Sequence, residues 1–308
     1  MTDSPSLQEF LSVQEHFNFK RTALVEKDFY VVKALAAIAA ADIAPFTLVF
    51  GGGTSLSRAH NLIRRMSEDI DLKITGDREP KRSELRRLRE TITQALLNAG
   101  FQFDPENPDH RRSRNESRYT IYQIPYAAQA PGNAALRPEI QIEVAVWPLR
   151  LPPEIKPVRS FVAEAFGRPA EVPAISCVSI TQTAAEKFVA LTRRVAVELS
   201  GNDRERDPTL IRHLYDLHTI RSHYDPAETM ALAATIIPHD VEEFGNQYPP
   251  YRADPLGETM KAIAALQTDA GYAASFDRLI EDMVYGEEPS FANCLETLNE
   301  LVKSLPQS

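Results

Sequence analysis

Residues 47–74 read TLVFGGGTSLSRAHNLIRRMSEDIDLKI, and the rest of the chain is organised around this stretch. It opens with an apolar run, which predicts a buried strand, and breaks at Gly51–Gly53. Apolar residues then recur at helical spacing from Thr54 to about Arg65, which predicts a short helix. From Ser67 to Ile74 apolar and polar residues alternate, which is typical of a strand with one buried face.

Two acids of the second strand, Asp69 and Asp71, are expected on one face, because successive strand side chains alternate. Two carboxylates on neighbouring positions of one strand face repel each other unless a cation lies between them. Mg²⁺ is the natural candidate, because it prefers oxygen ligands and is commonly held by one or two carboxylates plus substrate phosphates. An ordinary exposed strand face with two acids is the alternative. The order of strand, glycine turn, helix and D-x-D strand favours the metal site.

The glycines before the predicted helix let the backbone approach a phosphate, since no Cβ is in the way. The start of that helix, at Thr54, directs free N–H groups at the same anion. Two other phosphate-binding motifs do not match. A P-loop needs a Lys after its glycines, and a dinucleotide-binding motif needs a glycine where Leu56 stands.

This arrangement resembles the signature of the nucleotidyltransferase superfamily, in which a glycine pair precedes a helix and a D-h-D strand. Residues 52–72 are more narrowly similar to the AbiEii/AbiGii family, the nucleotidyltransferase toxins of bacterial toxin–antitoxin and phage-defence systems. The resemblance implies an α+β fold, with a nucleotidyltransferase-type mixed sheet and flanking helices, followed by a mostly helical C-terminal domain. It also implies that Asp69 and Asp71 are catalytic.

The family motif further implies a set of nucleotide-binding residues, which are Gly52, Gly53, Thr54 and Arg58. A later alternating run, Glu139–Trp147, resembles the family strand that supplies a third acidic metal ligand. Glu143 falls on that position, although Gln141 stands where the family has Lys. Glu139, on the same face, is the competing residue.

Two more motifs lie in the C-terminal part of the chain. The run AEKFVAL, residues 185–191, resembles a family motif whose Lys reaches the nucleotide phosphates, which implies that Lys187 is catalytic and binds nucleotide. The run RHLYDL, residues 212–217, resembles a third motif with Asp216 as its acid, near the Lys and needed for activity. Without the resemblance, Lys187 would be read as solvated and Asp216 as a simple surface acid.

Three other segments carry expectations about the fold. The run Val25–Asp28, with three consecutive charged residues, either forms a turn on a surface helix or matches a recurrent feature of the same family. Residues 102–117 read as a turn-rich loop whose arginines, Arg111, Arg112 and Arg114, either contact RNA phosphates or are simply exposed. Proline-rich residues 148–173 predict a linker or a peripheral loop, with the domain boundary near its end. We therefore expect a catalytic domain over residues 1–175 and a helical domain over 176–308 that completes the active-site cleft.

Composition narrows the class of protein. A net charge of −9 argues against a whole-surface nucleic-acid binder, so any such contact must be a local basic patch. Two cysteines, Cys177 and Cys294, lack metal-ligand spacing and predict buried thiols in a reducing cytoplasm. The N-terminus shows no signal peptide, and no apolar run approaches the roughly 20 residues of a membrane span. We expect a cytoplasmic protein without a membrane partner.

These observations together predict a nucleotidyltransferase toxin that depends on Mg²⁺ or Mn²⁺. It would transfer a nucleoside monophosphate from an NTP to an acceptor, with the tRNA 3′ end preferred, and inhibit growth or phage propagation. The resemblance implies an antitoxin encoded nearby. A nucleotidyltransferase for small molecules or proteins, and a catalytically silent binding module of the same fold, are the alternatives.

Overall fold

The computed structural model describes residues 4–132, 136–200, 207, 209–246 and 248–305. The chain divides into two units, Met1–Val178 and Ser179–Ser308. The first unit combines a mixed sheet with helices, and the regular structure of the second is helical in the residues described. The fold is therefore α+β with a helical C-terminal part, as the sequence predicted.

Within the described residues, seven strands form one sheet in the order β3-β4-β5-β2-β1-β7-β6. The strands are β1 (Thr47–Gly51), β2 (Asp69–Thr75), β3 (Arg111–Arg114), β4 (Tyr119–Pro125), β5 (Glu139–Val146), β6 (Glu154–Val158) and β7 (Val172–Cys177). The helices of this unit are α1 (Leu7–Phe17), α2 (Thr22–Ala39), α3 (Gly52–Arg58), α4 (Arg82–Asn98), the 3₁₀ turn η1 (Asn115–Ser117) and α5 (Phe161–Ala165). The pairs β1–β7 and β2–β5 are parallel and the other pairs are antiparallel.

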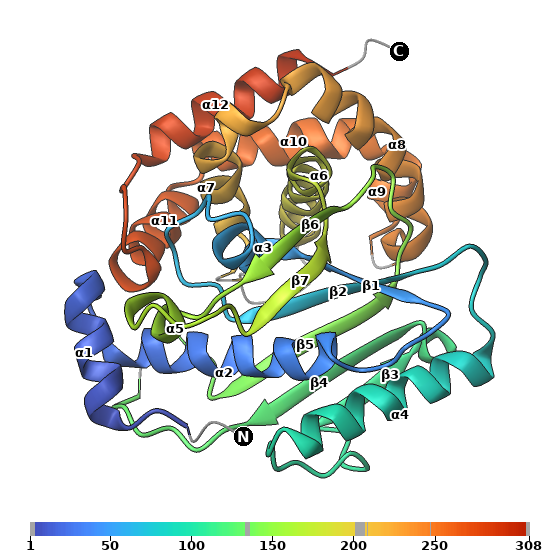
Figure 1. The fold of residues 1–308 in the computed structure, drawn as a ribbon. Coiled ribbons are helices and arrows are strands. Elements are labelled where there is room, and N and C mark those ends of the chain that lie inside the picture. Colours follow the sequence, from blue (N-terminus) through green and yellow to red (C-terminus); the bar gives the residue numbers. More distant parts are fainter. Residues whose placement is uncertain (1–3, 133–135, 201–206, 208, 247, 306–308) are drawn as a thin grey trace. The chain divides into compact units, whose positions relative to one another are not determined.

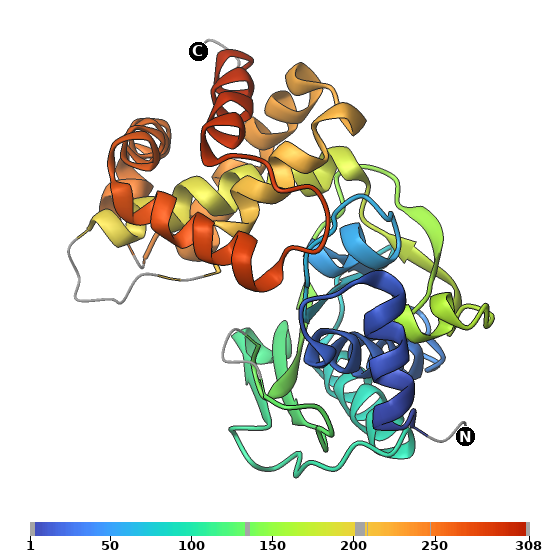
Figure 2. The same cartoon turned by 90° about the vertical axis from the view of Figure 1, so that its left-hand side faces the viewer.

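The two faces of the sheet differ in polarity because side chains alternate along each strand. One face forms the core with apolar side chains such as Ile70 and Ile142, packed with residues of α2 and α4 such as Leu35 and Leu88. Figures 1 and 2 show these two helices against that face. The other face carries the odd-numbered polar residues of β2 and β5, which are only partly buried.

The helix predicted over residues 54–65 begins at Gly52 and ends at Arg58. The chain then turns through Asn61, whose φ of 55° lies in the left-handed region that Asn tolerates. The predicted helix was too long because Ile63 fits the helical spacing of apolar residues. Ile63 is buried, but it lies beyond the end of the helix.

Two predicted loops contain strands. Residues 111–114 form β3, which pairs with β4 at one edge of the sheet. The proline-rich segment contains β6 and α5 and runs into β7, so it belongs to the first unit rather than linking two units. Prolines are tolerated there because β6 is the other edge strand, where a missing N–H does not interrupt a ladder.

The second unit is built around α6 (Ile180–Leu199), which packs on α7, α8 and α10. Ser179 caps this helix by accepting the N–H of Gln182 on its hydroxyl. The remaining elements are α7 (Arg212–Thr219), η2 (Arg221–His223), α8 (Pro226–Phe244), α9 (Pro249–Ala253), α10 (Pro255–Thr268), α11 (Ala270–Met283) and α12 (Phe291–Lys303). None of the helices in the described residues is long and apolar enough to cross a membrane.

Candidate active site

The glycine turn between β1 and α3 lies against the start of β2. Gly52 has a φ of +70°, and a Cβ built on it would lie 1.7 Å from Asp71 Oδ2. A Cβ on Gly53 would lie 2.6 Å from Ser67 Oγ and 2.7 Å from Arg65 Nη2. The positive φ makes glycine necessary at Gly52, where bare backbone lies beside a predicted catalytic carboxylate, whereas a side chain at Gly53 would displace Ser67 and Arg65.

Thr54 and Arg58 use their side chains inside the first unit. Thr54 is fully buried, and its hydroxyl contacts the carbonyl oxygen of Asp69. The Arg58 guanidinium lies over the Phe161 ring at 3.7 Å, and its Nε is 3.6 Å from Asp28 Oδ1. These contacts attach α3 to β2, α2 and α5. A nucleotide contact by either residue stays a prediction from the family resemblance.

The three predicted metal ligands lie on the same face of two neighbouring strands. In the parallel register of β2 and β5, Asp71 is opposite Glu143 and Asp69 is opposite Gln141. Their side chains are partly exposed, whereas the residues between them are buried. Glu139 pairs with Pro125 of β4 and has no partner residue in β2, because the pairing of β2 with β5 begins at Asp69 and Gln141. The register therefore favours Glu143 over Glu139 as the acid beside the aspartates.

Each of these carboxylates also has protein partners. Glu143 accepts hydrogen bonds from Tyr119 Oη at 2.9 Å and from Gln141 Nε2 at 2.7 Å, and Asp69 Oδ1 contacts Arg137 Nη1. Burial, followed by the nearby Glu143 charge, raises the pKa of Tyr119. Among the described residues, no group of three or more His, Cys, Asp or Glu side chains is arranged to hold a metal ion. Metal binding here stays a prediction.

Arg137 is a residue of this site that the sequence did not indicate. It lies two residues before β5, and its guanidinium forms an ion pair with Asp69. Its N–H donates to Glu68 Oε2 at 2.9 Å, and its carbonyl accepts from Lys27 Nζ at 2.8 Å. No local pattern marks Arg137, because its place depends on these long-range contacts.

Three consecutive charged residues of α2, Glu26, Lys27 and Asp28, are buried. The surface-helix alternative is therefore wrong. The Glu26 carboxylate accepts two backbone N–H groups of the segment after β4, at 2.7 and 2.9 Å. Asp28 Oδ2 accepts the N–H of Phe161 at 2.7 Å. Burial, opposed in part by Arg58, raises the pKa of Asp28 to about 6.

Lys187 of α6 and Asp216 of α7 form a buried ion pair in the second unit. Lys187 Nζ lies 2.7 Å from Asp216 Oδ2, and the side chains are 7% and 0% exposed. The readings of Lys187 as solvated and of Asp216 as a surface acid are therefore wrong. Buried charges need partners, so each residue stabilises the other in place. The structure thus brings together the Lys and the acid of the two C-terminal motifs.

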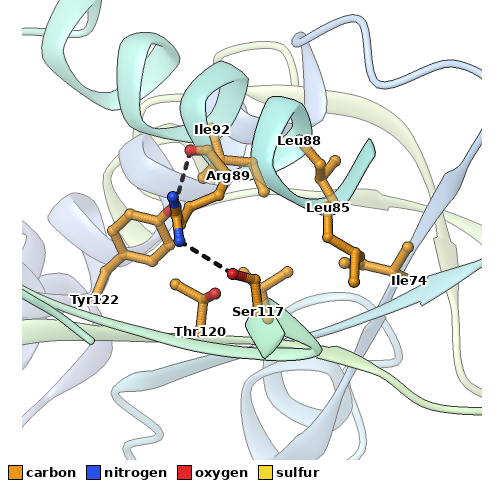
Figure 3. Close-up of a pocket in the computed structure, with 9 residues that line it drawn as sticks. Ile74, Leu85, Leu88, Arg89, Ile92, Ser117, Thr120 and Tyr122 are labelled. Carbon is orange, nitrogen blue, oxygen red and sulfur yellow. Dashed lines mark hydrogen bonds between the residues drawn. The ribbon is translucent and has the colours of Figure 1, made fainter. Parts of the chain in front are cut away.

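A small hollow lies between α4 and the core face of the sheet (Figure 3). Apolar side chains such as Ile74 and Leu85 line it, together with a few polar ones. Arg89 donates to Ser117 Oγ at 3.1 Å, and its carbonyl accepts from Tyr122 Oη at 3.0 Å. Because it opens on the core face, this hollow is separate from the face that carries the carboxylates.

Comparison with known proteins identifies the family. The family described as "Nucleotidyl transferase AbiEii toxin, Type IV TA system" matches residues 33–297. Among solved structures, the nucleotidyltransferase toxin MenT4 from Mycobacterium tuberculosis H37Rv is similar, with a TM-score of 0.53, 19% identity, and 96% of this chain and 99% of that chain covered. At this identity the likeness shows the fold alone. No curated protein matches at a significant level. Because the family match extends over most of the chain, this protein belongs to the AbiEii family of nucleotidyltransferase toxins of type IV toxin–antitoxin systems.

Proposed function

We propose that this nucleotidyltransferase is metal-dependent and transfers a nucleoside monophosphate to the 3′ end of tRNA. Family membership supplies the coarser statement, a nucleotidyltransferase toxin with an NTP substrate and an antitoxin partner. Metal dependence is proposed from the parallel register that sets Asp71 beside Glu143, with Asp69 on the same face. This is an arrangement of oxygen ligands suited to Mg²⁺ or Mn²⁺.

Metal binding at this face is part of the proposal, because Mg²⁺ is commonly held by only one or two carboxylates together with substrate phosphates. Three carboxylates share one face, and the backbone at Gly52 approaches Asp71 Oδ2 where any side chain would fill the space. A bound ion would offset charge on the triphosphate and favour ionisation of the acceptor hydroxyl.

In the proposed reaction the acceptor hydroxyl attacks the α-phosphorus of the NTP, and pyrophosphate leaves. Gly52 brings bare backbone next to the Asp71 carboxylate, and the proposal places the phosphates beside this turn. The carboxylate nearest the acceptor accepts the hydroxyl proton. The family resemblance assigns the Lys187 ammonium to the nucleotide phosphates, where it would offset charge on the leaving pyrophosphate, and the 2.7 Å ion pair with Asp216 would orient it.

The choice of tRNA rests on family resemblance and on a local basic surface. Arg112 and Arg114 are exposed on the edge strand β3 of a chain whose net charge is −9. Arg112 Nη2 is 2.9 Å from Gln123 Oε1, so a neighbouring strand orients it. A few cations of this kind predict RNA binding with a shallow salt dependence, because few counterions are released.

The decisive test is incubation with each α-labelled NTP and total cellular RNA, with Mg²⁺, Mn²⁺ or EDTA, followed by a denaturing gel. We expect label on RNA of tRNA size, lost with EDTA and lost in Asp71→Asn. Asp77→Asn, an exposed acid just after β2, is the matched control and should label normally. Label on protein or on a small molecule would replace the tRNA assignment. No transfer from any NTP would refute the proposal.

The proposed cellular consequence is arrest of growth or of phage propagation in the cytoplasm. Induced expression without the antitoxin should slow growth, because a catalyst can disable a large tRNA pool at low abundance. Asp71→Asn should relieve the arrest at equal protein level, as measured by growth curves and immunoblotting. Undiminished arrest by the variant would indicate sequestration of a target and would refute an enzymatic toxin.

A further inference from the structure

Arg137 forms an ion pair with one of the predicted metal ligands. Its Nη1 contacts Asp69 Oδ1, and the two side chains are 31% and 26% exposed. The guanidinium therefore lies where solvent and a substrate can reach it, and on the same carboxylate that a metal ion would need.

The backbone of Arg137 is fixed although its side chain is accessible. Lys27, which is fully buried, donates to the carbonyl of Arg137 at 2.8 Å and to that of Glu139 at 2.6 Å. Glu68, 2% exposed, accepts the Arg137 N–H at 2.9 Å and lies 3.5 Å from Lys27 Nζ. Lys27 of α2 and Glu68, which directly precedes β2, therefore hold the backbone of Arg137 in place. The Arg137 side chain can change partner while its backbone stays fixed.

The Arg137 guanidinium can bind either of two kinds of oxygen group, the Asp69 carboxylate or a phosphate of the nucleotide. A guanidinium binds carboxylate and phosphate oxygens with the same planar, two-pronged geometry. If a cation takes Asp69 Oδ1, the guanidinium loses that partner. The triphosphate that accompanies the cation offers a replacement within reach of the same fixed backbone.

We propose that Arg137 is a triphosphate-binding residue that exchanges Asp69 for a phosphate when the metal–nucleotide complex enters. This rests on the proposed metal-dependent function and deepens it. Before substrate arrives, the ion pair offsets charge on the acidic face. Afterwards the same side chain adds positive charge to the triphosphate. Lys27 and Glu68 are positioning residues that act through the Arg137 backbone.

The proposal predicts opposite changes in two binding measurements on Arg137→Ala. Mn²⁺ alone, titrated by electron paramagnetic resonance, should bind about fivefold more tightly, which is about 1 kcal/mol, because the competing cation is gone. The second measurement titrates each of the four α,β-methylene nucleoside triphosphates at saturating Mn²⁺. At least one of them should bind the wild-type protein, and its affinity for Arg137→Ala should be at least about tenfold lower. A side chain needed only for folding would weaken both.

Two further variants sharpen the result. Arg137→Lys keeps the charge, so Mn²⁺ affinity should stay near wild type, whereas nucleotide affinity should fall partway because the two-pronged geometry is lost. Arg118→Ala removes another partly exposed arginine of this unit, paired with Glu79 at 2.8 Å, and should change neither measurement.

Nucleotide affinity that is unchanged in Arg137→Ala would overturn the proposal, and so would Mn²⁺ affinity that is unchanged or weaker. Failure of the wild type to transfer any nucleotide would instead refute the proposed function. The two failures are distinguishable because neither titration requires turnover.

Discussion

Replacing Gly52 by Ala tests whether the glycine turn exists to admit the Asp71 carboxylate. The substitution has two separable effects. The backbone φ of +70° strains any L-residue by about 1–2 kcal/mol. The new Cβ would also lie 1.7 Å from Asp71 Oδ2 and 2.7 Å from its Cγ, so the carboxylate must move by more than 1 Å to restore ordinary contact.

Gly167→Ala separates these effects. Gly167 has a φ of +61°, and a Cβ there meets nothing within 4 Å, so the variant carries the strain without the clash. Each kcal/mol corresponds to a Tm shift of about 2–4 °C for a protein of this size class, so both variants should lose about 2–8 °C. Only Gly52→Ala should also lose catalysis, by about 100-fold in kcat/KM, because a 1 Å misplacement of a reacting group costs about that much.

The assay is nucleotide transfer at a temperature well below both melting points, with folded fraction measured by circular dichroism. Normal kcat/KM in folded Gly52→Ala would refute the reasoning, because the Asp71 carboxylate could then move without consequence. Equal loss of activity in Gly167→Ala would show that strain, not the clash, is responsible.

Three further perturbations test other parts of the site. Glu143→Gln should lower kcat at least about 100-fold in the transfer assay, whereas Glu139→Gln should not, and the reverse result would exchange their roles. Lys187→Ala should lower the free energy of unfolding by about 3–5 kcal/mol, because it removes the ammonium that lies 2.7 Å from the fully buried Asp216 carboxylate. The double variant Lys187→Met, Asp216→Leu should recover stability in denaturant titrations but not transfer, and recovered transfer would contradict a phosphate role. Burial raises the pKa of Asp28 from 3.8 to about 6, so its contribution to stability should fall by about 2 kcal/mol as pH rises from 4 to 7. Asp28→Asn should remove this slope from urea titrations at each pH.

The sequence predicted the acidic face well because that face depends on local periodicity. Alternation alone places Asp69 and Asp71 together, and the same alternation in β5 places Glu143 on one face with Gln141. The parallel register that sets Glu143 beside Asp71 was not predictable, since it depends on which strands become neighbours. The edge strands were missed for a related reason. Proline in β6 and turn-forming residues around β3 resemble loops, and edge positions tolerate both.

Buried charge was the feature least accessible from sequence. The run of charged residues at 26–28 looks like solvated surface, because such residues are rarely buried unless paired. Their partners are backbone groups more than 100 positions away, such as the N–H of Phe161 for Asp28. Pairing at that sequence separation leaves no local pattern. Only the resemblance to a family feature marked this run in advance.

Two buried lysines of this chain, Lys27 in the first unit and Lys187 in the second, have different surroundings. An ammonium carries three N–H donors. Lys27 directs its Nζ at two backbone carbonyls and at Glu68, so the protein itself accounts for three acceptors, and the side chain is 0% exposed. Lys187 makes its ion pair with one oxygen of Asp216 and keeps 6% of its surface in contact with solvent. The first lysine therefore holds the chain in place, whereas a phosphate contact by the second stays a prediction from the family resemblance.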